Sequence, residues 1–100
     1  MSGEARFDEL IHVSKRLRIC ALLAAATAVE FATLRDAVEA SDSAMSKHLA
    51  ALEAAGYVRS RREVRASRHR VWAALTPEGR RAYEGHVRAL REMLEPGMAP

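Results

Sequence analysis

Arginine is concentrated in one short segment of this 100-residue chain. Residues 57–76 carry six arginines and one acid, Glu63, for a net charge of +5, while residues 1–56 carry −2 and residues 77–100 are neutral. Guanidinium groups gathered so closely attract polyanions, and nucleic acid is the commonest partner of that kind. The alternative is that the arginines line an exposed edge strand and prevent it from pairing with another protein. The basic side chains available to a polyanion include Arg61, Arg62, Arg65, Arg68, His69 and Arg70.

A set of short polar side chains lies before this basic segment. Ser41 can cap a helix in which Met45, Leu49 and Leu52 follow at four- and three-residue steps and form a buried stripe. A helix is narrow enough to enter the major groove of B-DNA, so its opposite face can offer hydrogen-bonding groups to base edges. The outward residues of that face are Ser43, Ala44, Ser46 and Lys47.

The spacing of apolar residues predicts the elements that precede this helix. Apolar residues at three- and four-residue steps predict a first helix over residues 7–26. Residues 29–31 alternate as in a short strand. Thr33 followed by Asp36 matches a helix start, which predicts a short second helix from Thr33 to about Glu39.

The elements that follow the polar helix are predicted by turn and cap residues. Gly56 suits the left-handed residue that ends a helix. Two strands over residues 57–75 would form a hairpin with its tip at residues 65–67. Residues 76–78, Thr-Pro-Glu, match a helix start, and a last helix is expected over residues 77–95.

The last helix carries apolar residues at four-, three- and four-residue steps, which is the spacing of a coiled-coil seam. This stripe can pack on the first helix of the same chain or on a second copy, and we expect both. A chain of this size buries a modest core, which favours dimerisation. The residues expected at the dimer interface are Phe7, Leu10, Ile11, Tyr83, Val87, Leu90 and Leu94.

Composition bounds the class of protein. The length corresponds to one domain, and no apolar run approaches the 20 or so residues of a membrane span. The N-terminus lacks the pattern of a secretory signal, and the single cysteine, Cys20, cannot form an intrachain disulfide. We therefore expect a soluble cytoplasmic protein in which Cys20 is an inert core thiol, with redox sensing as the alternative.

Catalytic and metal-binding motifs do not stand out. No nucleophile, base and acid occur in a known arrangement, and there is no glycine-rich phosphate loop, so we expect neither an enzyme nor a cofactor. His12 and His86 lie on the helices expected at the interface, but they show no metal-ligand spacing. Trp72 could stack on a base, although covering the open face of the sheet is the simpler role.

Two segments resemble a known class of regulators. Residues 41–58 contain the pattern Ser-x-His-Leu-x-x-Leu-Glu-x-x-Gly-Tyr-Val, which resembles the recognition-helix segment of small bacterial regulators of the MarR and ArsR kind. Residues 75–80 resemble the Leu-Thr-x-x-Gly-Arg entry to their last helix. The resemblance implies a mainly α (α+β) winged helix-turn-helix, with the helix-turn-helix at residues 33–56 and a two-stranded basic wing at residues 57–75. Dimerisation helices would lie at residues 7–26 and 77–95.

The resemblance also implies a function. The expected protein is a sequence-specific regulator of transcription, a dimeric repressor that binds an inverted repeat in double-stranded DNA. The alternative is a winged-helix module that docks its arginine-rich hairpin on an acidic protein surface; RNA binding is less favoured because no aromatic platform is evident. Ser43, Ala44, Ser46 and Lys47 would read bases, and Arg65, Arg68 and Arg70, with Arg61, Arg62 and His69 behind them, would contact phosphates or the minor groove.

Some assignments stay open or depart from these regulators. His48 could contact phosphate or brace the preceding helix, and Thr33 and Ser41 at the helix starts could approach the DNA backbone. Asp42 could accept a hydrogen bond from cytosine or stabilise the helix end. The Cys-x-Cys motif of metal-sensing ArsR proteins is absent, which excludes thiolate metal sensing at that site. The hairpin tip also lacks the usual glycine or proline.

Overall fold

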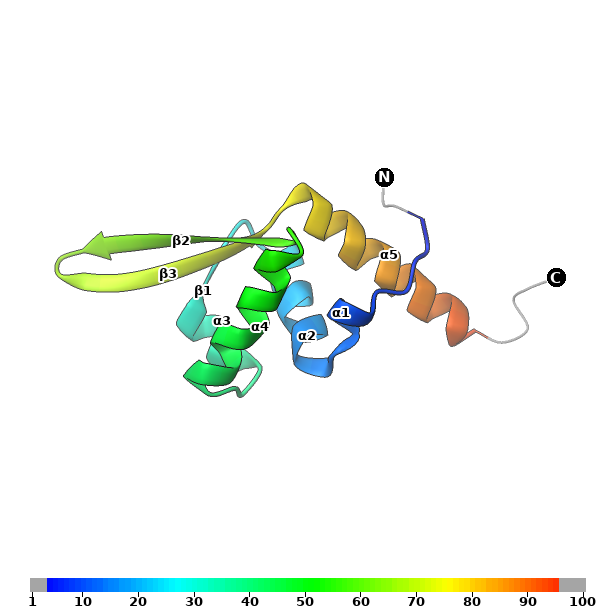
Figure 1. Cartoon of the computed structure of the whole chain (residues 1–100), viewed down its shortest axis with the longest axis horizontal. Helices are drawn as coiled ribbons and strands as arrows, with labels where there is room; N and C mark the ends of the chain where they lie inside the picture. Colours follow the sequence, from blue (N-terminus) through cyan, green and yellow to red (C-terminus); the bar gives the residue numbers. More distant parts are fainter. Residues whose placement is uncertain (1–3, 96–100) are drawn as a thin grey trace.

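The computed structural model describes residues 4–95, which form five helices and a three-stranded sheet. The predicted α+β composition is therefore correct. In Figure 1 the β2–β3 hairpin projects to one side of the group formed by α1 to α4, and α5 projects to the other side. The elements are α1 (Glu9–His12), α2 (Ser14–Ala24), β1 (Val29–Glu30), α3 (Phe31–Ala37), α4 (Asp42–Ala54), β2 (Val58–Arg65), β3 (Arg68–Leu75) and α5 (Pro77–Met93).

The sheet is antiparallel, with strand order β1-β3-β2. β1 pairs only with the base of β3, where Val29 lies opposite Ala73, so the outer part of the hairpin is a two-stranded ribbon. The ribbon is closed by Ala66 and Ser67, both with positive φ (51° and 66°). A two-residue connection of this kind is a type I′ turn, the geometry that matches the twist of two paired strands. The expected hairpin is thus present with a tight tip that contains no glycine.

The core lies between the helices and the base of the sheet. α2 and α3 pack against β3, and α4 packs against β2. Met45, Leu49 and Leu52 are buried, as their spacing in the sequence predicts. None of the helices within residues 4–95 combines the length and the apolar character that crossing a bilayer requires. The largest fully buried side chains are Ile11, Ile19, Cys20, Leu23, Leu34, Met45, Leu52 and His86.

Three predicted helix boundaries follow local chemistry and are confirmed. The Ser41 hydroxyl accepts from the Ala44 amide (3.0 Å) at the start of α4, and Gly56 leaves that helix with φ 81°. The Thr76 hydroxyl accepts from the Gly79 amide (2.9 Å) at the start of α5. Each cap satisfies an amide that the helix leaves free, which contributes about 1 kcal/mol to stability.

The predicted first helix is wrong as a single element. Val13, with ψ 126°, interrupts it and separates α1 from α2, and α1 is only four residues long. Asp8 caps the start of α1, accepting from the Ile11 amide at 3.2 Å, and Phe7 therefore lies outside the helix.

The predicted start of the second helix is also wrong. α3 begins at Phe31, directly after β1, so Thr33 lies inside its first turn and is not its cap. Glu30 takes the cap position while pairing with Trp72 in the sheet, and pairing with β3 thus sets the boundary in place of the local Thr33–Asp36 signal. α3 also ends earlier than expected, at Ala37.

Candidate nucleic-acid interface

The register of β2 and β3 sorts the hairpin arginines onto one face. Residues directly opposite each other in an antiparallel pair share a face, and faces alternate along each strand. Val58 and Ala73 are buried and mark the face that meets the core, and Arg62 and His69 share this face farther out. The opposite face, called the arginine face from here on, holds five of the six arginines: Arg59, Arg61, Arg65, Arg68 and Arg70.

The countercharges of the arginine face lie away from its tip. The carboxylate of Glu63 accepts from Trp72 Nε1 (3.1 Å) and lies 3.9 Å from the guanidinium of Arg61. Glu30 of β1 lies 3.9 Å from Arg70. Within residues 4–95 no acid pairs with Arg65 or Arg68, which lie opposite each other at the last position before the turn. The positive charge is therefore least compensated where the hairpin projects farthest.

Trp72 lies on the arginine face and is half-buried there. Its indole NH donates to the carboxylate of Glu63 on the neighbouring strand. This arrangement matches the simpler of the two expected roles, in which Trp72 covers the sheet face.

The outward face of α4 is polar and accessible. Ser43, Ser46 and Lys47 are exposed, and Ala44 is half-buried. These are the four positions that the sequence assigns to the outside of the helix. α4 packs against β2 close to the base of the hairpin, so the two candidate surfaces belong to neighbouring elements.

The turn between α3 and α4 is held by Arg35, which the sequence analysis missed. Its guanidinium donates to Asp36 (Nε to Oδ1, 2.9 Å) and to Asp42 (Nη1 to Oδ1, 2.9 Å). The hydrogen bonds that Arg35 donates to Asp36 and Asp42 raise the pKa of Arg35 above its ordinary value. Arg35 thus offsets part of the negative charge of Asp42 at the start of α4, which weakens the repulsion that a free carboxylate would exert on a nearby polyanion.

A second basic residue, Lys15 of α2, closes the end of α3. Its ammonium group donates to the carbonyls of Val38 (2.9 Å) and Glu39 (2.8 Å). Positive charge at a helix C-terminus satisfies free carbonyls and opposes the helix dipole. Glu39 has φ 55°, a left-handed conformation that Lys15 helps to hold. Spacing alone does not reveal this contact, because the partners are 23 and 24 residues away.

His48 is half-buried and links α4 to α2. Its Nδ1 accepts from Arg16 Nε of α2 at 3.2 Å, and Arg16 also donates to the Leu10 carbonyl. Burial, followed by the positive charges of Arg16 and Lys15, lowers the pKa of His48. A neutral acceptor is what this hydrogen bond requires, so the bracing role is favoured over a phosphate contact, although the partner is α2 and not the preceding helix.

The residues expected at a dimer interface have different environments. Ile11 is fully buried within the single chain and offers no surface to a partner. Leu10, Tyr83, Val87 and Leu90 are half-buried. Phe7 and Leu94 are exposed, at 39% and 76%.

Cys20 lies in the core with no exposed surface. Burial, aided by the negative charge of Asp8, raises the pKa of the Cys20 thiol to about 12. Since the thiolate is the reactive form, we expect a thiol reagent at mild alkaline pH to label the folded protein roughly a thousandfold more slowly than the unfolded chain. Labelling followed by mass spectrometry, with and without denaturant, measures this ratio; equal rates would contradict it.

Comparison with known proteins decides the family. A family model for the winged helix DNA-binding domain matches residues 15–94. The chain belongs to this family. The winged helix covers α2 to α5, so the recognition-helix segment and the basic hairpin identified from the sequence both lie inside the matched region. A comparison of the sequence with curated proteins found no match.

Solved structures support the same assignment. A transcriptional regulator homologue protein from Pyrococcus horikoshii OT3 matches this winged helix with a TM-score of 0.81, covering 87% of this chain and 86% of that chain at 18% identity. HlyU from Vibrio cholerae N16961 matches with a TM-score of 0.61, covering 86% of this chain and 80% of that chain at 29% identity. A MarR family transcriptional regulator from Silicibacter pomeroyi matches with a TM-score of 0.60, covering 91% of this chain and 62% of that chain at 34% identity. The predicted winged helix fold and the resemblance to small DNA-binding regulators are confirmed.

Proposed function

We propose that this winged helix protein is a dimeric repressor that binds an inverted repeat in double-stranded DNA. In this proposal the outward face of α4 enters the major groove and the arginine face of the hairpin lies against the neighbouring backbone or minor groove. The observation that carries the proposal is the sorting of charge, because five of six arginines share one face of a hairpin that extends beyond the helices. A solvated edge strand also turns its charges to the open face, but it does not need two opposed arginines without an acidic partner, as Arg65 and Arg68 are within residues 4–95.

The two surfaces would contribute differently to binding. Contacts to phosphates fix the position of a protein on DNA and are sensitive to salt, whereas contacts to base edges determine which sequence is bound. The guanidinium groups of Arg65 and Arg68, with which no acid of residues 4–95 pairs, suit the first role. The exposed hydroxyl and ammonium groups of Ser43, Ser46 and Lys47 suit the second, with Lys47 able to donate to guanine. Thr33, exposed in the first turn of α3, could add a backbone contact.

The distribution of apolar surface supports a dimer. Phe7 and Val13 are exposed beside α1, and Met93 and Leu94 are exposed at the far end of α5, which projects away from the other helices. Val87 and Leu90 keep part of their surface open on the same helix. A second copy that covers these residues would remove apolar surface from water and place two α4 helices on one duplex. Sedimentation should then show a dimer that binds one duplex per pair of chains.

The test compares one helix variant with the parent protein on two duplexes. A bound sequence is first selected from a random library, and affinity is then measured by fluorescence anisotropy on this duplex and on a scrambled one. Lys47→Ala should reduce the preference for the selected duplex by about 1–3 kcal/mol, the value of one good base contact, with a smaller loss on the scrambled one.

The unmutated protein tests whether the chain binds DNA at all. It should bind even random duplex at low salt, with affinity that falls steeply as salt is added. Absence of this salt-sensitive binding would overturn the proposal and favour docking on an acidic protein. Equal losses for Lys47→Ala on both duplexes would instead remove α4 from the role of reader.

A further inference from the structure

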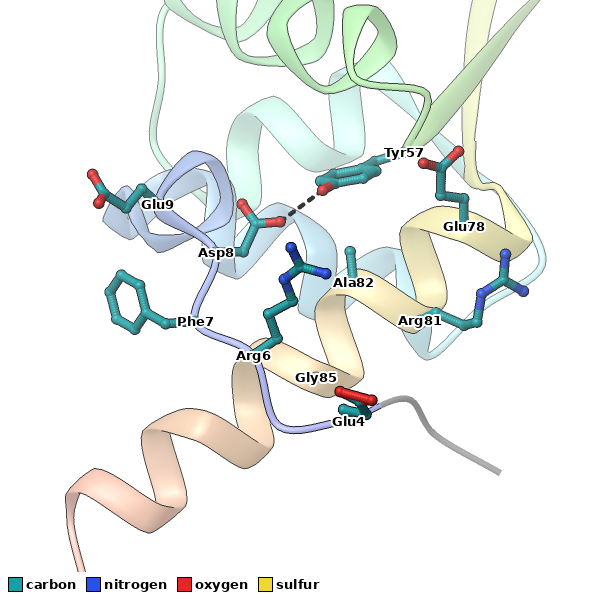
Figure 2. A pocket seen from close by; sticks show the side chains of 10 residues that line it. All are labelled: Glu4, Arg6, Phe7, Asp8, Glu9, Tyr57, Glu78, Arg81, Ala82 and Gly85. Carbon is teal, nitrogen blue, oxygen red and sulfur yellow. Dashed lines mark hydrogen bonds between the residues drawn. The ribbon is translucent and has the colours of Figure 1, made fainter.

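Residues 4–8 form a strap across α5 before the chain enters α1. The Arg6 amide donates to the Gly85 carbonyl at 2.9 Å. The strap passes so close to α5 that a Cβ on Gly85 would lie 2.6 Å from the Glu4 carbonyl oxygen. Figure 2 shows Glu4 and Arg6 beside Gly85, at one wall of a hollow of about 520 Å³ that also reaches Tyr57 and Glu78.

Asp8 joins the strap to three other parts of the molecule. Its amide donates to His86 Nδ1 of α5 at 2.9 Å, and its Oδ1 caps α1. Its Oδ2 accepts from the Tyr57 hydroxyl at 2.7 Å, the dashed contact in Figure 2. This bond, with burial, raises the pKa of Tyr57 to about 12, so the phenol remains a donor at neutral pH.

Tyr57 lies at the joint between the two candidate DNA surfaces. Its amide donates to the Leu52 carbonyl of α4, and its carbonyl accepts from the Thr76 amide at the end of β3. Tyr57 also directly precedes β2. Asp8 therefore links α5 to the point where α4 passes into the hairpin.

The docked strap requires a neutral His86. Because His86 Nδ1 accepts from Asp8, the ring proton must be on Nε2, which lies 3.3 Å from His12 Nδ1 and can donate to it. Both imidazoles lie against the Phe7 ring, with centroids 4.7 Å away. A proton added to His86 Nδ1 would face the Asp8 amide hydrogen, break that bond and place a charge in a site with no exposed surface.

The groups around His86 set the direction of its titration. The ionisable groups whose charges act on His86 are His12 from α1 and Asp8 from the strap. Burial, followed by the charge of His12, lowers the pKa of His86 below its ordinary value, and Asp8 opposes this only in part. When the strap is undocked, His86 is free of these effects and binds a proton more readily than in the docked state. Acid below about pH 6.5 therefore favours undocking.

We propose that the His12–His86 pair makes the strap a proton-sensitive clamp, which undocks in mild acid and loosens the joint between α4 and the hairpin. The effect on DNA rests on the proposed function, whereas undocking itself does not. With one extra proton bound by the undocked state, the docking equilibrium shifts about tenfold per pH unit below the ordinary histidine pKa. DNA affinity falls in the same direction once the strap is open in most molecules.

The first experiment measures undocking without DNA. NMR hydrogen exchange on the full chain gives the protection of the Arg6 and Asp8 amides at about pH 7.5 and about pH 5.5, corrected for intrinsic rates and compared with a core amide such as Leu49. The clamp predicts a loss of protection of roughly tenfold in the two strap amides and little change at Leu49. Equal protection at both pH values would overturn it.

Two variants separate the clamp from general instability. His86→Asn keeps an acceptor near Nδ1 but does not titrate, so its strap should stay protected at the lower pH; a parent-like loss would count against the clamp. Tyr57→Phe removes only the hydroxyl that reaches Asp8, so its strap should still open in acid while DNA affinity becomes less sensitive to pH than in the parent. This second variant retains the core histidine and keeps the test available if His86→Asn does not fold.

The DNA measurements distinguish the two proposals. Absence of binding at pH 7.5 would overturn the proposed function and leave the exchange result standing. Binding that is unchanged in acid although the strap has opened would overturn the coupling to the joint. Because His86→Asn leaves the hairpin unchanged, a fall in parent affinity in acid relative to His86→Asn is the expected signature.

Discussion

Arg68→Ala should weaken binding to every duplex by roughly tenfold at moderate salt and lower the salt slope by about one per protomer. Arg68 lies at the tip of the arginine face, opposite Arg65, and no acid within residues 4–95 pairs with either. Like charges at directly opposed positions disfavour strand pairing, so the substitution should not destabilise the hairpin. The loss should therefore reflect DNA contact and not misfolding.

Arg91→Ala is the matched control for charge. Arg91 is an exposed arginine in the last turn of α5, a helix that projects away from the hairpin (Figure 1). The two variants have the same net charge, and a general effect of charge would reduce the affinity equally in both. Titrations of both variants on one random duplex at four salt concentrations measure the slopes. Identical slopes for both variants would show that the hairpin tip does not contact phosphate.

Gly79→Ala should destabilise the fold by about 3 kcal/mol or more. Helix propensity alone predicts a gain of up to about 1 kcal/mol, since alanine is favoured over glycine in a helix. At this position, however, a Cβ would lie 2.0 Å from the Tyr57 carbonyl oxygen and 2.7 Å from its carbonyl carbon. These are backbone atoms fixed by the bond from the Thr76 amide, so the steric cost exceeds the propensity gain. Denaturant unfolding measures the difference.

Gly85→Ala provides the comparison, because it makes the same chemical change in the same helix. Its Cβ would meet the Glu4 carbonyl oxygen at 2.6 Å, but this atom belongs to the strap, which can move away. Global stability should change by no more than about 1 kcal/mol, while the strap amides lose protection. If Gly79→Ala were as stable as Gly85→Ala, the close packing of α5 on Tyr57 would be incorrect.

Local signals in the sequence predicted those parts of the fold that depend on neighbouring residues. Ser41 and Thr76 cap helices with amides three residues ahead, and Gly56 supplies the left-handed residue after α4. The buried stripe of α4 follows from helical spacing alone. These predictions are correct because the atoms that stabilise each feature lie within about one helical turn of each other in the sequence.

The errors come from contacts between distant segments. Asp8 starts α1 later than predicted, and it is hydrogen-bonded to Tyr57 and His86, which are 49 and 78 residues away. Thr33 lost the cap position because Glu30 is held in the sheet by Trp72. No periodicity within the chain encodes such pairings.

The sequence predicted which residues form the candidate site, but it did not predict how the arginines of both strands are divided between the two faces of the hairpin. The sequence shows six arginines in one segment, yet their division between faces depends on a register set by the turn at Ala66 and Ser67. This turn lacks the glycine signal of a two-residue hairpin. The roles of Arg35 and Lys15 were missed for a similar reason, because neither follows from helical spacing. Arg35 donates to Asp42 on the far side of the turn between α3 and α4, and Lys15 donates from α2 to the Val38 carbonyl in that turn.

The central claim is that the outward face of α4 and the tip of the arginine face contact the same duplex. Affinity cleavage tests it directly, with a DNA-cleaving iron chelate attached to Ser43→Cys or Ser67→Cys, two exposed positions, while the buried Cys20 stays unlabelled. We predict cuts from both positions on one selected duplex, separated by about half a helical turn, with the Ser43→Cys cuts centred on the major groove. Cleavage from only one of the two positions, or cuts from Arg91→Cys as strong as either, would contradict this account.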